Sequence, residues 1–292
     1  MYYVVYGLLY LLSLLPMQIL YLISDFVYLL VYYVFGYRKG VVRKNLSIAF
    51  PEKSAQELKK IERKFYRNFT DNFIETLKMI SAGPAWADKH FISDNTLFNR
   101  LYEKGHKVQV YLGHNFNWEI ANVAISIHLK FVPLMVYMPL NNQVFDKIMH
   151  KLRSSSGSIL ISARNIAAEL LPYRDSQYLI GLVADQVPGK LKNAWWGEFF
   201  GKLTPFPKGP EKFGRANETA IVFAAIYKVK RGYYKLEYNL ATDKPAELPE
   251  GEVTRRYIRF LESAIREHPE NWLWTHRRWK REWKEEYVEN TL

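Results

Sequence analysis

The sequence of 292 residues contains no cysteine. Without cysteine the chain has no disulfide, no thiolate nucleophile and no cysteine-bound zinc or iron–sulfur cluster. It also lacks the G-x-S-x-G pattern of a serine nucleophile and the H-E-x-x-H pattern of a zinc site. We therefore expect no metal, and we expect proton transfer to rely on histidine and carboxylate side chains.

Charge is almost missing from the first 35 residues. Between Tyr2 and Phe35 the only full charge at neutral pH is Asp25, and Leu, Tyr, Val and Ile make up most of the rest, as in membrane segments. One continuous helix would be roughly 50 Å long against a hydrocarbon core of about 30 Å, so Pro16 is expected to divide it. Met17–Tyr37 alone could span a bilayer. A hairpin lying in the interface is the alternative that Asp25 and the tyrosines favour.

Positive charge follows this segment at once, in Arg38, Lys39, Arg43 and Lys44. Basic flanks of membrane helices stay on the cytoplasmic side. The whole chain has a net charge of +12 and a pI near 9.5, which attracts nucleic acid, acidic lipids or an acidic carrier protein. The apolar segment favours lipid over nucleic acid. We predict an anchor over 1–45 and a domain over 46–292 that faces the cytoplasm.

Strand and helix patterns alternate along the rest of the chain, which indicates an α/β sheet with helices on both faces. Ser54 and Glu57 form a capping box that starts a helix over 54–80, and GPAWAD is expected to end it. A last amphipathic helix is expected over 251–268. The predicted strands are KVQVYL, FVPLMVY, GSILIS, YLIGLVAD, TAIVFAAIY and YYKLEYNL, with helices near 117–128, 142–153, 163–172 and 209–217.

The stretch LGHNFNWEIAN, residues 112–122, places His114 five positions before Glu119. Because it follows the strand KVQVYL, His114 is expected at the edge of the sheet, where ligand crevices form. A carboxylate holding the ring Nδ1–H would leave Nε2 to accept a proton from an incoming hydroxyl. Chance alone gives about one such spacing in a chain of this composition. The same residues also suit a helix cap, so the stretch alone leaves both interpretations open.

This stretch resembles the H-x-x-x-x-D/E motif of the glycerolipid and lysophospholipid acyltransferase superfamily. It is most similar to the motif of the bacterial late lipid A acyltransferases, the HtrB-type lauroyl- and myristoyltransferases. The resemblance covers about residues 1–282 and implies a glycerol-3-phosphate acyltransferase-like fold, with a mixed central sheet flanked by helices and an N-terminal membrane helix. Four further stretches resemble the family in order and spacing: YMPLNNQVFDKIMHKLRSSSG, LVADQVPG, FFGKLTPFPKGPEKFGRAN and HPENWLWTHRRWK.

The resemblance implies a membrane-bound enzyme that moves a fatty acyl chain from acyl carrier protein to a hydroxyl of a lipid A precursor. This step belongs to lipopolysaccharide biosynthesis at the cytoplasmic face of the bacterial inner membrane. The implied partners are acyl carrier protein, membrane lipids and the lipid acceptor, with no nucleic acid and no cofactor besides the acyl donor. His114 is the implied general base, and Glu119 is its orienting partner.

Three residues in the middle blocks are implied to bind substrate. Arg153 matches an arginine whose guanidinium suits a phosphate of the acceptor or of the carrier's pantetheine arm. An ordinary solvated helix face is the alternative for Arg153. Asp185 and Gln186 match a pair at a strand end that positions the acceptor, and a plain turn is the alternative.

The last two blocks contribute four more candidates. Thr204 and Gly209 are implied to shape the site or hold the thioester oxygen, and they would equally serve a bend and a helix start. Arg277 and Arg278, among tryptophans, are implied to hold an anionic headgroup at the bilayer surface. The alternative is that the tryptophans fasten the C-terminal segment to the core.

Other functions stay open from the sequence. The same scaffold serves acylation of lysophospholipids and amino-acid lipids, and neither the chain length nor the acceptor is readable here. A thioesterase with water as acceptor would use the same base. A non-catalytic protein that binds anionic membranes is the alternative outside enzymology, and the presence of both His114 and Glu119 within the ordered blocks favours catalysis.

Overall fold

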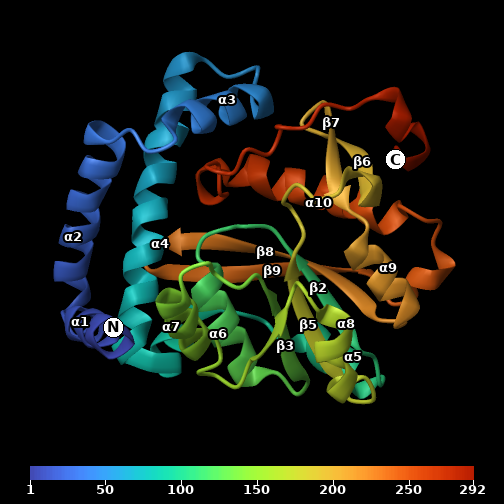
Figure 1. Ribbon diagram of the computed structural model, residues 1–292, viewed down its shortest axis with the longest axis horizontal. Helices are drawn as coiled ribbons and strands as arrows, with labels where there is room; N and C mark the ends of the chain where they lie inside the picture. The colour runs from blue at the N-terminus through green and yellow to red at the C-terminus, as the bar shows by residue number, and fades with distance from the viewer.

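The computed structural model describes residues 1–292 and is built on a seven-stranded sheet in the order β1-β9-β8-β2-β5-β3-β4 (Figure 1). From β8 to β4 the neighbouring strands are parallel, whereas β9 is antiparallel to β8. The predicted mixed α/β sheet is therefore confirmed. The strands are β1 (Phe91–Ile92), β2 (Val108–Leu112), β3 (Val132–Tyr137), β4 (Ile159–Ser162), β5 (Tyr178–Val183), β8 (Ala220–Lys230) and β9 (Tyr233–Thr242), and a separate hairpin joins β6 (Ala194–Phe199) to β7 (Lys202–Pro207).

Ten α-helices accompany the strands. In chain order they are α1 (Tyr2–Ser13), α2 (Met17–Leu29), α3 (Lys39–Ala49), α4 (Ala55–Lys89), α5 (Thr96–Glu103), α6 (Trp118–His128), α7 (Gln143–Arg153), α8 (Ile166–Leu170), α9 (Gly209–Ala216) and α10 (Glu252–Glu267). A π-helical turn, Leu30–Val34, extends α2. Short 3-10 turns lie at Leu171–Tyr173, Leu191–Asn193, Pro245–Glu247, Pro269–Asn271 and Glu285–Asn290.

The helix predicted over 54–80 starts where the capping box places it. The Ser54 hydroxyl accepts the backbone N–H of Glu57, and the Glu57 carboxylate accepts the backbone N–H of Ser54 at 2.8 Å. The helix that starts here is interrupted at Gly83, the first residue of the predicted GPAWAD end, and a second helical segment then runs on to Lys89 within α4. Gly83 has φ +69°, which only glycine adopts readily, and Pro84 fits the first turn after this break. The predicted end is therefore confirmed for the first helical segment, and the second segment follows across a kink.

Each of the six predicted strands forms a strand, and the helices predicted near 117–128, 142–153, 163–172, 209–217 and 251–268 are present. The sequence patterns did not predict α3, α5, β1 or the β6–β7 hairpin. These elements are short, and their burial depends on neighbours that are distant in sequence.

The two faces of the sheet carry separate hydrophobic cores. Val110 and Val222 pack with Ile120 of α6 in one core, to which α4 and α5 also contribute. Tyr111 and Phe223 face the other way and pack against α10 and the β6–β7 hairpin. Because side chains alternate along a strand, β2 supplies both cores and fixes the loop that follows it.

The N-terminal helices pack against the long helix α4, and Figure 1 shows α2 beside it. Met17–Val34 is long and apolar enough to cross a membrane. Tyr28 and Tyr32 share a core cluster with Leu46 and Phe65. Residues on both sides of position 45 therefore pack in one core. The predicted boundary between an anchor over 1–45 and a domain over 46–292 stays a prediction.

Candidate active site

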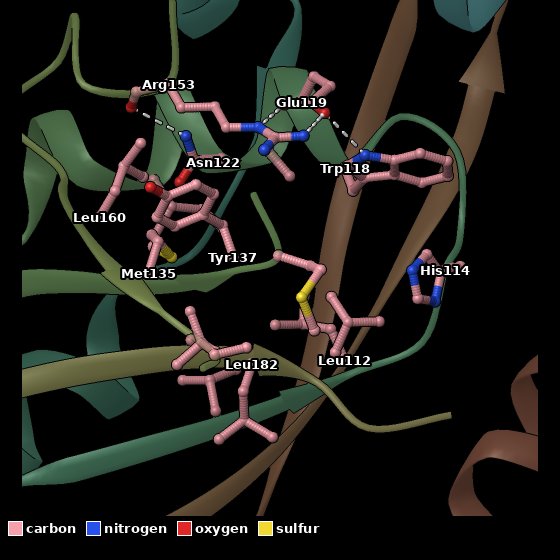
Figure 2. Close-up of a pocket in the computed structure, with 18 of the residues that line it drawn as sticks. Leu112, His114, Trp118, Glu119, Asn122, Met135, Tyr137, Arg153, Leu160 and Leu182 are labelled. Carbon is pink, nitrogen blue, oxygen red and sulfur yellow. Dashed lines mark hydrogen bonds and ion pairs between the residues drawn. The ribbon is translucent and has the colours of Figure 1, made fainter. Parts of the chain in front are cut away.

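A cavity of about 520 Å³ opens at the carboxyl edge of β2, β3 and β5, beneath α6 (Figure 2). Of its 23 lining residues 17 are hydrophobic, so the cavity suits a hydrocarbon chain better than a sugar or a nucleotide. His114 and Gln186 lie at the strand ends, whereas Leu179 lies near the start of β5. The cavity therefore runs along the sheet from a polar mouth to an apolar end.

Gly181 in β5 keeps this cavity open. A Cβ atom at this position would lie 2.7 Å from Sδ of Met135 on the neighbouring strand, closer than carbon and sulfur can approach. Both residues line the cavity. A larger residue at 181 would push the methionine side chain into the space, so glycine here preserves the cavity's width.

His114 is held by Asp185, which differs from the prediction of Glu119 as its partner. Oδ1 of Asp185 accepts a hydrogen bond from the ring Nδ1–H at 2.5 Å, and Oδ2 accepts the backbone N–H of His114 at 2.8 Å. Leu112 of β2 is in register with Val183 of β5, so residues two positions later leave the sheet side by side. Adjacent parallel strands thus bring together side chains that are 71 residues apart.

Asp185 is buried, with 1% of its surface exposed. Burial raises the pKa of this carboxyl, but the attraction of His114 and the hydrogen bonds from His114 and Trp272 outweigh it and lower the pKa to about 2. The indole Nε1–H of Trp272 donates to Oδ2 at 2.7 Å. The role of Trp272 was missed, because its position in the tryptophan-rich tail suggested the bilayer surface.

The other ring nitrogen of His114 faces the mouth of the cavity. The Gln186 side-chain nitrogen lies 3.0 Å from Nε2, so its amide N–H donates to the unprotonated nitrogen when Nδ1 carries the proton. Asp185 thus selects the tautomer in which Nε2 holds a lone pair. A substrate hydroxyl that took the place of the Gln186 amide would meet a proton acceptor.

Glu119 forms a second cluster on the opposite wall of the cavity. Its carboxylate accepts hydrogen bonds from Nε of Arg153 at 2.8 Å and Nη2 at 2.5 Å, and from the indole N–H of Trp118 at 3.0 Å. Figure 2 shows His114 apart from Glu119 and Arg153, although the Trp118 ring packs edge-on against the His114 ring with 5.6 Å between the ring centres. Both charged side chains are largely buried, and Asn122 of α6 donates to the Arg153 carbonyl. The cluster joins the start of α6 to the end of α7.

Thr204 and Gly209 do not line the cavity. Thr204 lies in β7, is 1% exposed and donates to the carbonyl of Lys202. Gly209 is the first residue of α9. Gly209 thus matches the helix start that was its alternative, whereas Thr204 lies within a strand, in register with Gly197 of β6.

The C-terminal block is mostly core, which corrects the prediction that Arg278 meets the bilayer surface. Arg278 is fully buried, and its guanidinium carbon lies 4.2 Å from the centre of the Phe206 ring. Trp272 and Trp274 are also buried, as their alternative required. Arg277 alone among these four residues is exposed.

Two buried basic groups stand behind Asp185. No hydrogen-bond acceptor contacts the Arg278 guanidinium, and burial lowers its pKa to about 10 although Asp185 attracts the charge. Burial likewise lowers the pKa of His276 to about 4, although Asp185 favours its charged form. The positive charge of Arg278 attracts the carboxylate of Asp185 without a direct hydrogen bond between them.

Comparison with known proteins agrees with the geometry. Residues 1–281 match the family described as bacterial lipid A biosynthesis acyltransferase. The "Lipid A biosynthesis palmitoleoyltransferase" of Escherichia coli (strain K12) and the "Lipid A biosynthesis acyltransferase" of Shigella flexneri are each 23% identical over 250 residues, covering 83% of this chain and 79% of theirs. Because the family match spans nearly the whole chain and its histidine lies at the mouth of an apolar cavity, the chain belongs to the bacterial lipid A biosynthesis acyltransferases.

Proposed function

We propose that this acyltransferase moves a fatty acyl chain from an acyl carrier protein thioester to a hydroxyl of a lipid A precursor, at the cytoplasmic face of the inner membrane. The observation that carries the proposal is the His114–Asp185 pair at the mouth of an apolar cavity. The names of the two relatives support lipid A biosynthesis as the pathway. The ordered blocks and the base at the sheet's carboxyl edge favour a glycerol-3-phosphate acyltransferase-like fold.

The base acts through Nε2 of His114. The acceptor hydroxyl approaches Nε2, which takes its proton as the oxygen attacks the thioester carbonyl carbon. The tetrahedral intermediate collapses, the carbon–sulfur bond breaks, and the proton on Nε2 passes to the leaving sulfur. Asp185 acts through the ring, because it holds Nδ1–H in place and stabilises the imidazolium.

The cavity receives the acyl chain of the donor. Its mouth lies at His114 and Gln186, so a chain inserted along the sheet leaves its thioester carbon beside the base. Leu179 at the start of β5 and Phe98 of α5 line the cavity far from that mouth. The chain length is therefore set by how far the methyl end travels toward these residues.

Arg153 binds Glu119 in the cavity wall and still has N–H groups free to bind substrate. Nε and Nη2 hold Glu119, whereas Nη1 has no protein acceptor. Arg153 lines the cavity and about a fifth of its side chain is exposed. We assign its remaining N–H groups to an anionic group of the substrate at the mouth. Arg277, exposed near the C-terminus, offers a second contact for an acidic carrier.

The test is transfer from radiolabelled acyl carrier protein into lipids of the native membrane, followed by separation of the lipids. Wild type is expected to yield a labelled lipid A precursor, and His114→Ala is expected to yield none while it remains folded and membrane-bound. His90→Ala is the matched control, because His90 stacks on Trp86 away from the cavity.

Three other outcomes would change the assignment. Label in another lipid would keep the enzyme and replace the acceptor, and free fatty acid without acylated lipid would indicate a thioesterase. Full activity of His114→Ala would refute the base. The absence of turnover with every donor chain length would move the assignment to a non-catalytic membrane-binding protein.

A further inference from the structure

The apolar helix that could span a membrane has its polar face against the rest of the protein. Asp25 lies at the centre of Met17–Val34, the position that would reach the bilayer midplane. Its carboxylate accepts hydrogen bonds from the Arg231 guanidinium at 2.8 and 3.1 Å. Arg231 lies between β8 and β9, in the turn of the sheet's antiparallel pair. The midpoint of the candidate span is therefore paired with the catalytic domain.

Arg231 and its neighbours clamp α2 to α4 as well. Nη2 of Arg231 donates to Asp71 of α4 at 2.7 Å, and the buried Ser24 hydroxyl of α2 donates to the same carboxylate at 2.8 Å. One turn away, the Tyr21 hydroxyl donates to Glu75. We call Ser24, Asp25, Asp71 and Arg231 the α2 clamp.

A second set of contacts fixes the corner between α1 and α2. The Lys78 ammonium donates to the carbonyls of Ser13 and Leu15 at 3.0 and 3.1 Å, and the Ser81 hydroxyl donates to Ser13. Both donors belong to α4. The corner between α1 and α2 and the middle of α2 are therefore both held by α4.

These contacts conflict with a transmembrane orientation of α2. If Asp25 lay at the midplane, Arg231, Asp71 and Lys228, which also pairs with Asp71 at 3.1 Å, would have to enter the hydrocarbon with it. Charged side chains at the centre of a bilayer are costly, because the hydrocarbon cannot replace their hydration. Breaking the clamp instead would leave Asp71, which is 2% exposed, without its cations.

The opposite side of α2 is an apolar stripe. Ile19, Leu22, Phe26, Leu29 and Tyr33 follow one another at spacings of three or four residues and are each 43–69% exposed. Leu20, Ser24 and Tyr28 on the other side are buried. A helix that packs one side against the protein and exposes an apolar stripe on the other matches a helix that lies at an interface.

The stripe continues along α1 toward the cavity. Tyr3, Val4, Leu8 and Leu11 of α1 are exposed. The Lys151 ammonium of α7 donates to the Tyr6 hydroxyl at 3.1 Å, so α1 lies against α7. Met138, Leu140 and Phe145, which lead from the cavity mouth into α7, are also exposed. This apolar face is rimmed by exposed cations, among them Arg38, Arg67, Lys147 and Lys151.

We propose that α1, the outer stripe of α2 and the segment 138–145 dip into one leaflet of an anionic bilayer, and that the α2 clamp prevents α2 from crossing it. The apolar face fits the acyl region, and the cations at its rim fit anionic headgroups. In this orientation the cavity mouth borders the leaflet that holds the lipid substrate. The proposal goes beyond the acyl transfer, since it concerns how the protein sits on the membrane.

The absence of cysteine allows a direct test in native membranes. Leu29 lies at the edge of the apolar stripe and also borders the groove between α2 and the β8–β9 turn, so Leu29→Cys with Val229→Cys places two thiols on exposed residues of the same groove. A short bismaleimide is expected to join them in most molecules before any detergent is added. Leu29→Cys with Asp175→Cys, on a remote exposed turn, is the control and should not be joined. If α2 spans the bilayer, the thiols at positions 29 and 229 will not be joined in the membrane, although both react with maleimide in detergent. This result would overturn the proposal.

A second measurement tests the membrane face itself. Leu22→Glu with Phe26→Glu is expected to reduce binding to vesicles of phosphatidylethanolamine and phosphatidylglycerol at least about tenfold, because two apolar contacts are replaced by charges. Leu171→Glu with Val288→Glu changes equally exposed apolar residues elsewhere and should bind as wild type does. Unchanged binding of the first variant would refute the face. Both readouts are independent of turnover, so they distinguish this proposal from the proposed acyl transfer.

Discussion

Two buried carboxylates lie at or near the cavity, Glu119 in its wall and Asp185 against the ring of His114, and they serve different partners. Asp185 holds the ring of His114 and is joined by Trp272, whereas Glu119 holds the guanidinium of Arg153. The first carboxylate lies where two parallel strands end, and the second lies in the first turn of α6. Both are buried acids near the same cavity mouth, so their partners decide their roles. Asp185 orients the proton-accepting ring of His114, and Glu119 joins α6 to α7 through Arg153.

The largest effect is expected from Asp185→Asn. An amide at this position cannot stabilise the imidazolium and allows the wrong tautomer, so kcat should fall about 10³- to 10⁴-fold with KM nearly unchanged. The measurement is steady-state transfer from acyl carrier protein at saturating donor and acceptor. Trp272→Phe removes one hydrogen bond to the same carboxylate and is expected to cost less. A loss for Asp185→Asn below tenfold would remove this residue from the mechanism.

Glu119→Gln is expected to act on stability. The change leaves the charge of Arg153 without its carboxylate, and breaking a buried pair costs about 3–5 kcal/mol. The free energy of unfolding, measured by urea denaturation, should fall while kcat per folded molecule changes much less than in Asp185→Asn. Glu119→Met with Arg153→Met removes both charges and should recover stability. Equal kcat losses in the two single variants would erase the distinction between the clusters.

These two carboxylates also show which features could be predicted from the sequence and which needed the fold. Six strands, most helices and the position of His114 at a strand end followed from period and motif, because those signals are local. The partner of His114 did not, since five residues of separation favoured Glu119. Only the pairing of β2 with β5 places Asp185 beside the ring. Asp185 itself was identified from its block, but its role as the positioning carboxylate needed the strand order.

The tail shows the same limit. Tryptophans and arginines are typical of membrane interfaces, yet Trp272, Trp274 and Arg278 are buried under the β6–β7 hairpin and beside Asp185. Composition gives the preference of a residue for an environment, and the fold decides which surface it reaches. The N-terminus was predicted as a membrane segment, and Met17–Val34 is long and apolar enough to cross one, whereas the α2 clamp depends on residues about 50 to 200 positions away.

The free energy of unfolding should depend on pH in the acid range because of Asp185. The pKa of Asp185 is lowered from 3.8 to about 2, so its stabilisation is present above the unfolded value and is lost as the pH falls through the folded value. Between about pH 4 and pH 2 wild type should lose about 2 kcal/mol from this group. Denaturation measured across this range should show a smaller loss in Asp185→Asn. An identical slope in both proteins would contradict the proposed ion pair with His114.

The smallest effect is expected at the apolar end of the cavity. Leu179→Phe adds volume there and should shift donor preference toward shorter acyl chains, with stability lowered by about 1–3 kcal/mol. Competition between acyl carrier proteins loaded with different chains measures the shift. Leu134→Phe, in the core on the other side of β3, is the control and should leave preference unchanged. Unchanged preference in Leu179→Phe would place the acyl chain elsewhere.

The most direct test of the account is nuclear magnetic resonance of the ¹⁵N-labelled histidine side chains. The Nδ1–H proton of His114, assigned by its loss in His114→Gln, should resonate far downfield because it is shared with a buried carboxylate. We predict that this signal disappears or moves sharply upfield in Asp185→Asn and stays in place in Glu119→Gln. A signal that survives Asp185→Asn and is lost in Glu119→Gln would contradict the assignment of the two carboxylates.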